Sequence, residues 1–374
     1  MSEQKKEEAM TTSSSFVDGT KGELIYRGYD IRDLGVNATY EEVIYLLWND
    51  KLPNAHELDL FKAALQAKRF VPEAVLNVMR AFPRDAQPMA VLRTAVSAMG
   101  LIDRDADNIT HDGARDKALL LTAVMPSLVA AWERLRNGKE PVRPRLGLGQ
   151  AANFLYMLEG KEPNPDAVAA FDSYLVLLAD HGFNASTFSA RVTTSTGSDF
   201  YSAITSAIGT LKGPAHGGAT QRAMEQFFSA AERGDIAAWF DESLAAGKRI
   251  MGIGHRIYKV EDPRAKILKP LAEKLANSSG KGQWFEVADT IQQLARQNDY
   301  FIERNLYANV DYYSAVVLYT IGLPVDQFTC LFAISRVAGW CSQVLEQLAD
   351  NRLIRPKESY VGKRDQVYVP LGER

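Results

Sequence analysis

The chain has 374 residues, of which 46% are hydrophobic and 24% charged, and its 43 Lys and Arg against 46 Asp and Glu give a net charge of −3. This composition is typical of a soluble globular protein with a large core, and it excludes disordered and collagen-like architectures for most of the chain. The balanced charge lacks the positive field that drives non-specific nucleic-acid binding. We therefore expect small polar ligands, and neither nucleic acid nor a membrane, as partners.

Cysteine usage and the first residues indicate a reducing compartment. Cys330 and Cys341 stand in no CxxC or Cys/His spacing, so they predict neither a disulfide framework nor a metal site. Residues 1–14 contain no arginine and no apolar run, which excludes a secretory signal and an Arg-rich transit peptide. We expect residues 1–14 to be a mobile tail and the protein to be cytoplasmic.

The first predicted elements are two short strands, Phe16–Val17 and Glu23–Tyr26, around a turn that contains Gly19 and Gly22. They carry nearly the only strand signal in the chain. The remaining pattern is helical, so we expect an all-α architecture with minor β structure at the two ends.

Helix starts are marked by local chemistry. Thr39 with Glu42, and Asn54 with Glu57, have the spacing of a capping box. Asn164 is placed to cap a helix whose first residue is proline, where a missing N–H costs nothing. Further helices are predicted from Pro72, Pro88 and Pro165, through Phe240, and over 263–276, 284–300, 312–321 and 327–348.

Three of the five histidines adjoin a glycine at a predicted helix end. His181 follows the helix that starts at Pro165. It is either a functional residue or a cation that the helix dipole stabilises, and the sequence favours neither interpretation. His216 precedes two glycines and the next helix. The positive end of that dipole favours a neutral imidazole, which can donate a hydrogen bond to a developing enolate oxygen. Alternatively, His216 is a turn residue whose imidazole forms hydrogen bonds with backbone groups.

The segment from Lys248 to Lys269 holds seven cations against two anions, a local excess of five positive charges. Within it, His255 lies on a glycine-containing loop and Arg264 follows Pro263 at a predicted helix start. Guanidinium groups bind carboxylates and phosphates with two parallel hydrogen bonds. An anionic partner is expected here, and a solvated charged face is the alternative.

Two further charged residues stand out. Arg336 is the single charge in the helix predicted over 327–345, and a buried guanidinium is costly unless it pairs with a structural carboxylate or an acidic ligand. Asp311 precedes another helix, so its simplest interpretation is an N-cap. A GxGxxA pattern at 147–152 lacks the surrounding βαβ unit of a dinucleotide site, and no spacing predicts a metal centre.

Taken in order, these motifs resemble the citrate synthase family, and the resemblance covers residues 16–362. It implies an all-α homodimer with a minor N-terminal β-hairpin. Each subunit would have a large domain, 15–218 plus 323–374, and a small domain, 219–322, that closes over substrates. The segments that carry the resemblance are Tyr26–Ile31, His216–Gly218, Gly254–Lys259 with Asp262–Arg264, Asn309–Asp311 and Arg352–Pro356.

The resemblance also implies the chemistry of the site. His216 would stabilise the enol of acetyl-CoA, Asp311 would remove its methyl proton, and His255 would polarise the carbonyl of oxaloacetate. Hydrolysis of the citryl thioester would then give citrate and coenzyme A without a metal or cofactor. The dicarboxylate would be held by His181, Arg264, Arg336 and the partner subunit's Arg355, and coenzyme A by Lys259 and Arg256.

Two alternatives remain open at this stage. A 2-methylcitrate synthase would use propionyl-CoA, and one extra methylene in a pocket is worth only ~1–3 kcal/mol of discrimination. By resemblance, Val310 and residues 350–353 favour citrate. The other alternative is a non-catalytic helical protein that binds an acyl-CoA or a dicarboxylate, which the joint presence of His216, His255 and Asp311 argues against.

Overall fold

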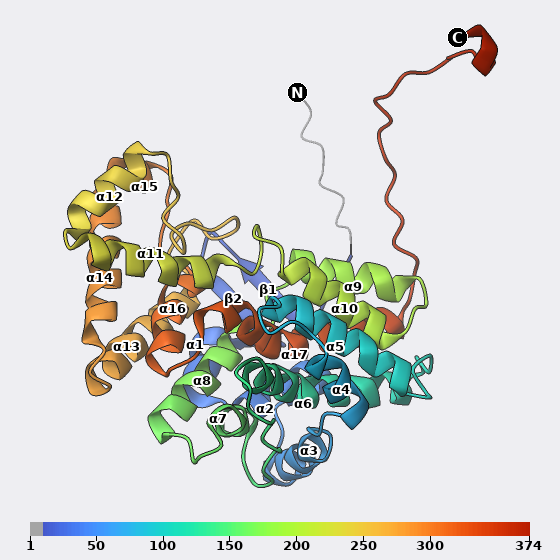
Figure 1. Cartoon of the computed structure of the whole chain (residues 1–374), viewed down its shortest axis with the longest axis horizontal. Helices are drawn as coiled ribbons and strands as arrows, with labels where there is room; N and C mark the ends of the chain where they lie inside the picture. Colours follow the sequence, from blue (N-terminus) through green and yellow to red (C-terminus); the bar gives the residue numbers. More distant parts are fainter. Residues whose placement is uncertain (1–9) are drawn as a thin grey trace.

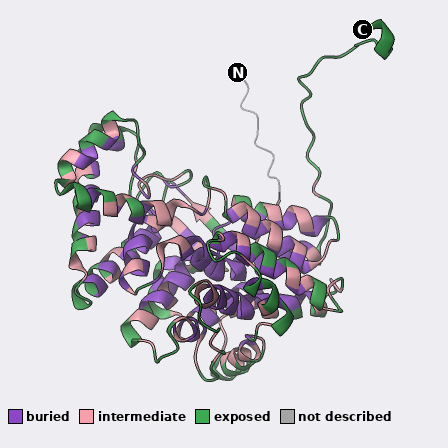
Figure 2. Ribbon diagram, viewed as in Figure 1, coloured by how far each residue is buried: buried purple, intermediate pink, exposed green. Residues whose placement is uncertain are grey.

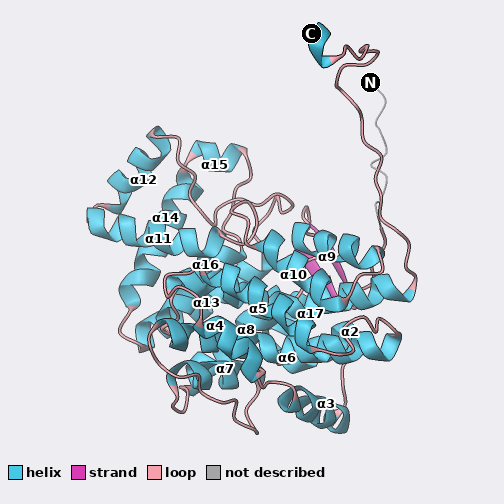
Figure 3. Cartoon of the chain, turned by 45° about the vertical axis from the view of Figure 1, so that its right-hand side comes forward, coloured by secondary structure: helices cyan, strands magenta, loops and turns pink. Residues whose placement is uncertain are grey.

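The structure is a computed structural model that describes residues 10–374, and it confirms the all-α prediction (Figures 1 and 3). The strands are β1 Ser15–Asp18, β2 Glu23–Tyr26 and β3 Tyr29–Asp30. The helices are α1 Ile31–Asn37, α2 Tyr40–Asn49, α3 Ala55–Ala67, α4 Glu73–Arg80, α5 Pro88–Ile102, α6 His111–Arg136, α7 Gln150–Glu159, α8 Pro165–Leu178, α9 Ala185–Ser195, α10 Phe200–Leu211, α11 Ala219–Arg233, α12 Ile236–Ala245, α13 Pro263–Ser278, α14 Gly282–Gln297, α15 Asp299–Glu303, α16 Val310–Thr320 and α17 Phe328–Ala349, with short 3₁₀ turns η1 Val325–Gln327 and η2 Leu371–Glu373.

The predicted N-terminal hairpin is present. β1 and β2 pair antiparallel with Ser15 opposite Tyr26, and the short β3, which the pattern did not predict, pairs with β2. The β structure expected at the C-terminal end is absent from the described residues. Residues 351–374 are almost entirely exposed and extend away from the body, so no neighbouring strand is there to pair with them (Figures 1 and 2).

The predicted helix starts are confirmed where their signals are local. Thr39 N donates to Glu42 Oε2 at 2.8 Å, and Asn54 and Glu57 exchange hydrogen bonds of 2.9 Å in both directions. Asn164 caps α8, in which Pro165 is the first residue. These contacts satisfy N–H groups that have no partner inside the helix.

Helix α17 runs through the centre of the core, and every residue from Phe328 to Val344 is buried (Figure 2). It packs against α6, α8 and α9. By length and composition alone, α6 and the stretch Val325–Ala349 could cross a membrane, but 72% and 94% of their most apolar windows are buried inside the fold.

The helices α11, α12, α14 and α15 project to one side of the body in Figure 1, with α13 and α16 between them and the remaining helices. Contacts of α13 with α1 and α8, and of α16 with α8, join this group to the body. The group lies within residues 219–322. The large-domain and small-domain boundaries themselves stay a prediction.

The mobile tail predicted over residues 1–14 is wrong for its last part. Residues 1–9 lie outside the described residues, but Thr12 Oγ1 donates to Glu346 Oε2 at 2.6 Å and Ser14 is fully buried. Ser14 Oγ also lies 2.8 Å from Ser342 Oγ on α17. Residues 11–14 are small and polar, and their sequence gives no sign of order. Their hydrogen bonds to α17, which is distant in the chain, hold the segment in place.

Asp172 on α8 gives a test of the packing around α2. Its carboxylate receives only long hydrogen bonds of 3.3 and 3.4 Å from Tyr40 N. Burial, and then the charge of Glu41, raises the pKa of Asp172 to about 8. Because this lies above the unfolded value, the folded state retains a proton that the unfolded state loses. The loss of folding free energy caused by Asp172 therefore grows as pH rises from about 4 to 8 and reaches its full value above pH 8.

We expect Asp172→Asn to raise the Tm at pH 8.5 by roughly 2 °C or more, corresponding to about 1–2 kcal/mol, and to change it little at pH 4.5. Thermal denaturation at both pH values measures this, with Asp59→Asn on the exposed side of α3 as the matched control. The same Tm change at both pH values would contradict the assignment.

Candidate active site

Six side chains that the sequence singled out converge from six segments of the fold. The charge of Arg336 acts on the pKa values of His181, His216 and Asp311, and that of Arg264 acts on those of His181, His255 and Asp311. The positions are His181 between α8 and α9, His216 between α10 and α11, His255 before α13, Arg264 in the first turn of α13, Asp311 in the first turn of α16, and Arg336 within α17.

His181 lies beyond the C-cap of α8 and is 7% exposed. Its Nε2 lies 3.1 Å from the hydroxyl of Tyr258, and its ring centroid is 5.5 Å from that of His255. Burial, and then the charges of Arg264 and Arg336, hold the pKa of His181 well below its usual value. This lowered pKa disagrees with the interpretation of His181 as a cation at a helix end, because burial and two guanidinium groups disfavour the charged imidazole.

His216 occupies the turn that precedes α11. Its Nε2 lies 2.8 Å from Ser186 Oγ, so Nδ1 is the ring nitrogen left for a ligand. Burial, and then Arg336, lowers the pKa of His216 to about 4, which agrees with the expected neutral imidazole but through a different cause. Gly217 is required here because a Cβ would lie 2.4 Å from the carbonyl oxygen of Leu211.

The protonation of His255 is fixed by the backbone that follows it. Its Nδ1 accepts hydrogen bonds from Ile257 N and Tyr258 N, both at 3.1 Å. Burial, and then Arg264, lowers the pKa of His255 to about 4. A neutral ring whose Nδ1 is an acceptor carries its proton on Nε2, so His255 is a hydrogen-bond donor at Nε2.

Arg264 is already paired within the protein. Its Nε and NH2 donate to the two carboxylate oxygens of Asp262 at 3.0 and 2.8 Å, and both side chains are at most 3% exposed. Asp262 also caps α13 and accepts from Val310 N at 3.1 Å. One carboxylate thus pairs with Arg264 and connects α13 to the first turn of α16.

The N-cap interpretation of Asp311 is wrong. The N-cap of α16 is Asn309, whose Oδ1 accepts from Asp311 N at 2.9 Å. The carboxylate of Asp311 is therefore not used for capping, and its Oδ1 accepts from Thr220 Oγ1 at 2.5 Å. Burial raises the pKa of Asp311, while Thr220 and the nearby arginines oppose that rise. Nothing in the sequence pattern pointed to Thr220, which lies on α11.

Arg336 is 2% exposed and forms no ion pair within residues 10–374. Its Nε donates to Leu178 O at 2.7 Å, and its guanidinium carbon lies 4.7 Å from the ring centroid of Phe332. The negative charge of Asp180 acts on it without a hydrogen bond. Of the two partners considered from the sequence, a directly bonded structural carboxylate is excluded within the described chain, and the guanidinium is available to an acidic ligand.

The remaining candidates are placed differently. Arg256 and Lys259 are exposed on the loop that carries His255, and neither forms an ion pair within the described residues. Arg355 is exposed and lies in segment 351–374, which extends away from the body of the fold (Figure 1). No group of three His, Cys, Asp or Glu side chains in residues 10–374 is arranged to hold a metal ion.

The arrangement combines neutral imidazoles, a carboxylate and buried guanidinium groups. A carboxylate beside a hydrogen-bond donor can remove a proton next to a carbonyl while the donor stabilises the enolate. Guanidinium groups in the same site can bind a dicarboxylate. Proton abstraction from one substrate beside a bound dicarboxylate is therefore the chemistry that these residues can perform.

Comparison with known proteins gives consistent results. The family model described as "Citrate synthase, C-terminal domain" matches residues 5–357. The citrate synthase of Haloferax volcanii is 48% identical over 96% of this chain and 95% of its own length. A 2-methylcitrate synthase of Mycobacterium tuberculosis is 38% identical over 96% of this chain and 89% of its own length.

The solved structures agree with the sequence matches. A ternary complex of citrate synthase from Thermoplasma acidophilum with carboxymethyl coenzyme A and oxaloacetate superposes with a TM-score of 0.92 at 35% identity, covering 98% of this chain and 97% of that one. With the whole-chain family match and this structural agreement, the chain belongs to the citrate synthase family.

Proposed function

We propose that the protein condenses acetyl-CoA with oxaloacetate and water to give citrate and coenzyme A. The observation that carries this proposal is the placement of Asp311. Asn309 caps the helix, so the carboxylate of Asp311 is not needed for capping. The charge of the buried Arg336 acts on this carboxylate and on two neutral histidines. A base, hydrogen-bond donors and a dicarboxylate-binding cation are the groups that this reaction requires.

Asp311 would remove the methyl proton of acetyl-CoA. Its raised pKa makes it a stronger base than an exposed aspartate, since burial destabilises the ionised form. Thr220 holds Oδ1, which leaves Oδ2 for the substrate. A carboxylate alone is too weak for a thioester α-proton, so the enolate oxygen must be stabilised at the same time.

His216 would supply that stabilisation from Nδ1. This requires the tautomer with its proton on Nδ1, so Nε2 accepts from Ser186 Oγ. The indole N–H of Trp340 donates to the same Ser186 oxygen at 3.1 Å, and that hydroxyl also lies 2.8 Å from the acceptor Asn184 Oδ1, so its one hydrogen must turn from Asn184 to His216 for this tautomer to form. A positioned donor of this kind stabilises a developing oxyanion by roughly 2.7–4 kcal/mol.

The electrophile would be oxaloacetate, with His255 Nε2 donating to its keto oxygen. His181, Arg264 and Arg336 would hold its carboxylates. Because Asp262 already occupies two nitrogens of Arg264, Arg336 is the stronger anion-binding group. Exclusion of water would protect the enol until condensation, after which water hydrolyses the citryl thioester.

A homodimer would complete this site with the partner subunit's Arg355. In its own chain Arg355 lies on the extended segment 351–374, which also exposes apolar side chains. Val361 is 96% exposed and Tyr368 is 78% exposed. Burial of such side chains against a second copy would stabilise a dimer. Coenzyme A phosphates would meet Arg256 and Lys259, whose charges are unpaired in the described chain. We propose a cytoplasmic enzyme that needs no cofactor.

The relative 2-methylcitrate synthase keeps propionyl-CoA as a second candidate substrate. Initial rates of thiol release with oxaloacetate, compared as kcat/KM for acetyl-CoA and propionyl-CoA, separate the two activities. We expect at least a tenfold preference for acetyl-CoA. The reverse preference would assign 2-methylcitrate synthase activity, and oxaloacetate binding without thiol release would assign a non-catalytic role.

The base assignment predicts a separation of binding from turnover. Asp311→Asn should reduce kcat by about 10²–10⁴-fold, since positioned proton transfer is lost. The Kd for oxaloacetate should change less than twofold because the amide keeps the size of the carboxyl. The control is Asp299→Asn, an exposed position on α15, which should leave both quantities unchanged. Wild-type kcat in Asp311→Asn would overturn the assignment of the base.

A further inference from the structure

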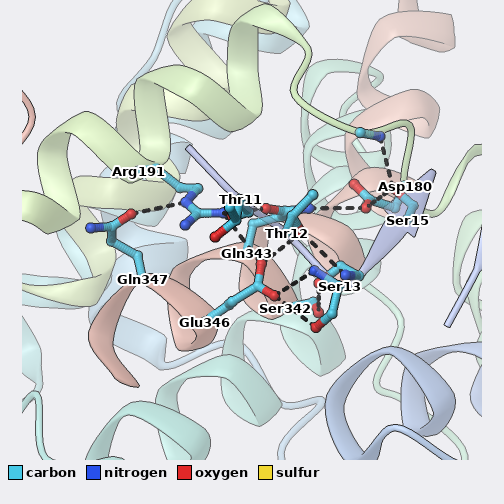
Figure 4. A network of polar contacts seen from close by, with 12 residues as sticks. Thr11, Thr12, Ser13, Ser15, Asp180, Arg191, Ser342, Gln343, Glu346 and Gln347 are labelled. Carbon is cyan, nitrogen blue, oxygen red and sulfur yellow. Dashed lines mark hydrogen bonds and ion pairs between the residues drawn. The ribbon is translucent and has the colours of Figure 1, made fainter. Parts of the chain in front are cut away.

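The turn that carries His181 is held by a residue about 165 positions earlier in the chain. Ser15 Oγ donates to Asp180 Oδ2 at 2.6 Å and accepts from Gly182 N at 2.8 Å (Figure 4). Ser15 is 7% exposed and Asp180 is fully buried. A single buried hydroxyl therefore contacts the residue on each side of His181.

A second hydroxyl reaches the same turn from the neighbouring strand. Tyr26 Oη donates to Asp180 O at 2.8 Å and lies 3.2 Å from Asp180 N. Ser15 and Tyr26 are directly opposite each other in the β1–β2 register, so their side chains lie on the same face of the hairpin. This cross-strand pair fixes both the backbone and the carboxylate of Asp180.

The position of Ser15 is set by the residues that precede it. Ser13 N and Thr12 Oγ1 donate to the two carboxylate oxygens of Glu346, at 2.7 and 2.6 Å (Figure 4). Glu346 belongs to α17, the helix that also carries Arg336. The N-terminal segment is thus fastened to the same helix that supplies the buried guanidinium of the site.

Asp180 cannot easily change its place to compensate for the loss of Ser15. A Cβ on Gly339 would lie 2.7 Å from Asp180 Oδ1, so this carboxylate packs directly on the backbone of α17. Among residues 10–374 its Oδ1 has no hydrogen-bond partner, and Oδ2 has only Gln343 Nε2, at 3.3 Å, besides Ser15. Removing the hydroxyl would leave a buried carboxylate poorly satisfied, and the turn would have to shift.

We propose that Ser15 is a positioning residue for His181, whose imidazole it holds at the dicarboxylate site through Asp180 and Gly182. Ser15 itself does not touch the substrate. This inference rests on the proposed function, in which His181 binds oxaloacetate. It assigns the N-terminal hairpin a role in substrate affinity in addition to its role in the fold.

The test compares two adjacent buried serines in the full chain. Ser15→Ala should raise the Kd and the KM for oxaloacetate at least tenfold while the KM for acetyl-CoA changes less than twofold. Ser14→Ala is the matched control, because it removes a buried hydroxyl from the same segment that has no contact with the His181 turn. It should leave the oxaloacetate Kd within twofold of wild type. Ser15→Thr, which keeps an Oγ, should restore affinity.

Isothermal titration with oxaloacetate, steady-state kinetics and the Tm of each variant give the readout. Equal oxaloacetate affinities for Ser15→Ala and Ser14→Ala would overturn the inference, as would a stable Ser15→Thr that remains weak. If Ser15→Ala does not fold, Tyr26→Phe removes the other hydroxyl and should also raise the oxaloacetate Kd; an unchanged Kd there would overturn the inference. Wild-type affinity in His181→Ala would instead overturn the proposed role of His181, and this inference with it.

Discussion

The burial of one guanidinium, that of Arg336, is the constraint on which the site depends. A charge at the centre of an apolar helix is costly unless the surroundings stabilise it. Within residues 10–374, Leu178 O, the face of Phe332 and the negative charge of Asp180 do so without a direct ion pair. The charge is therefore only partly neutralised, and its field reaches the other groups of the site.

The positive charge of Arg336 favours the neutral form of the histidines and the ionised form of Asp311. It joins burial in keeping His181 and His216 neutral, so that both can serve as hydrogen-bond donors near pH 7. On Asp311 it acts against burial and favours the ionised form that a base requires. A residue proposed to bind substrate therefore also prepares the residues proposed to perform the proton transfer.

The sequence predicted the elements whose causes are local. The capping boxes at Thr39 and Asn54, the proline-started helices and the N-terminal hairpin depend on residues within a few positions of one another. Burial of the helix around Arg336 is also predicted from local sequence, because that helix is an apolar run with a single charge. The cap was predicted at Asp311, but Asn309, two residues earlier, has similar capping ability, and only the backbone conformation decides between them.

The supporting residues could not be predicted because their partners are distant in the chain. Thr220 is separated from Asp311 by 91 positions, Tyr258 from His181 by 77, and Ser15 from Asp180 by 165. Serine, threonine and tyrosine are common in turns and strands, so their types carry no signal of these contacts. A resemblance to a family locates the residues expected to react, but their supports become visible only in three dimensions.

The small N-terminal sheet contacts two of the segments that carry site histidines. At one end of β1, Ser15 holds the turn of His181, and just beyond the other end Gly19 O accepts from Lys259 N at 2.8 Å on the loop of His255. A Cβ on Gly19 would lie 2.2 Å from Ile257 O, so the approach requires glycine. An extended strand is a stiff spacer of nearly fixed length. The hairpin therefore connects the segment of His181 to the segment of His255. A change in the strand register of the hairpin would move one imidazole relative to the other.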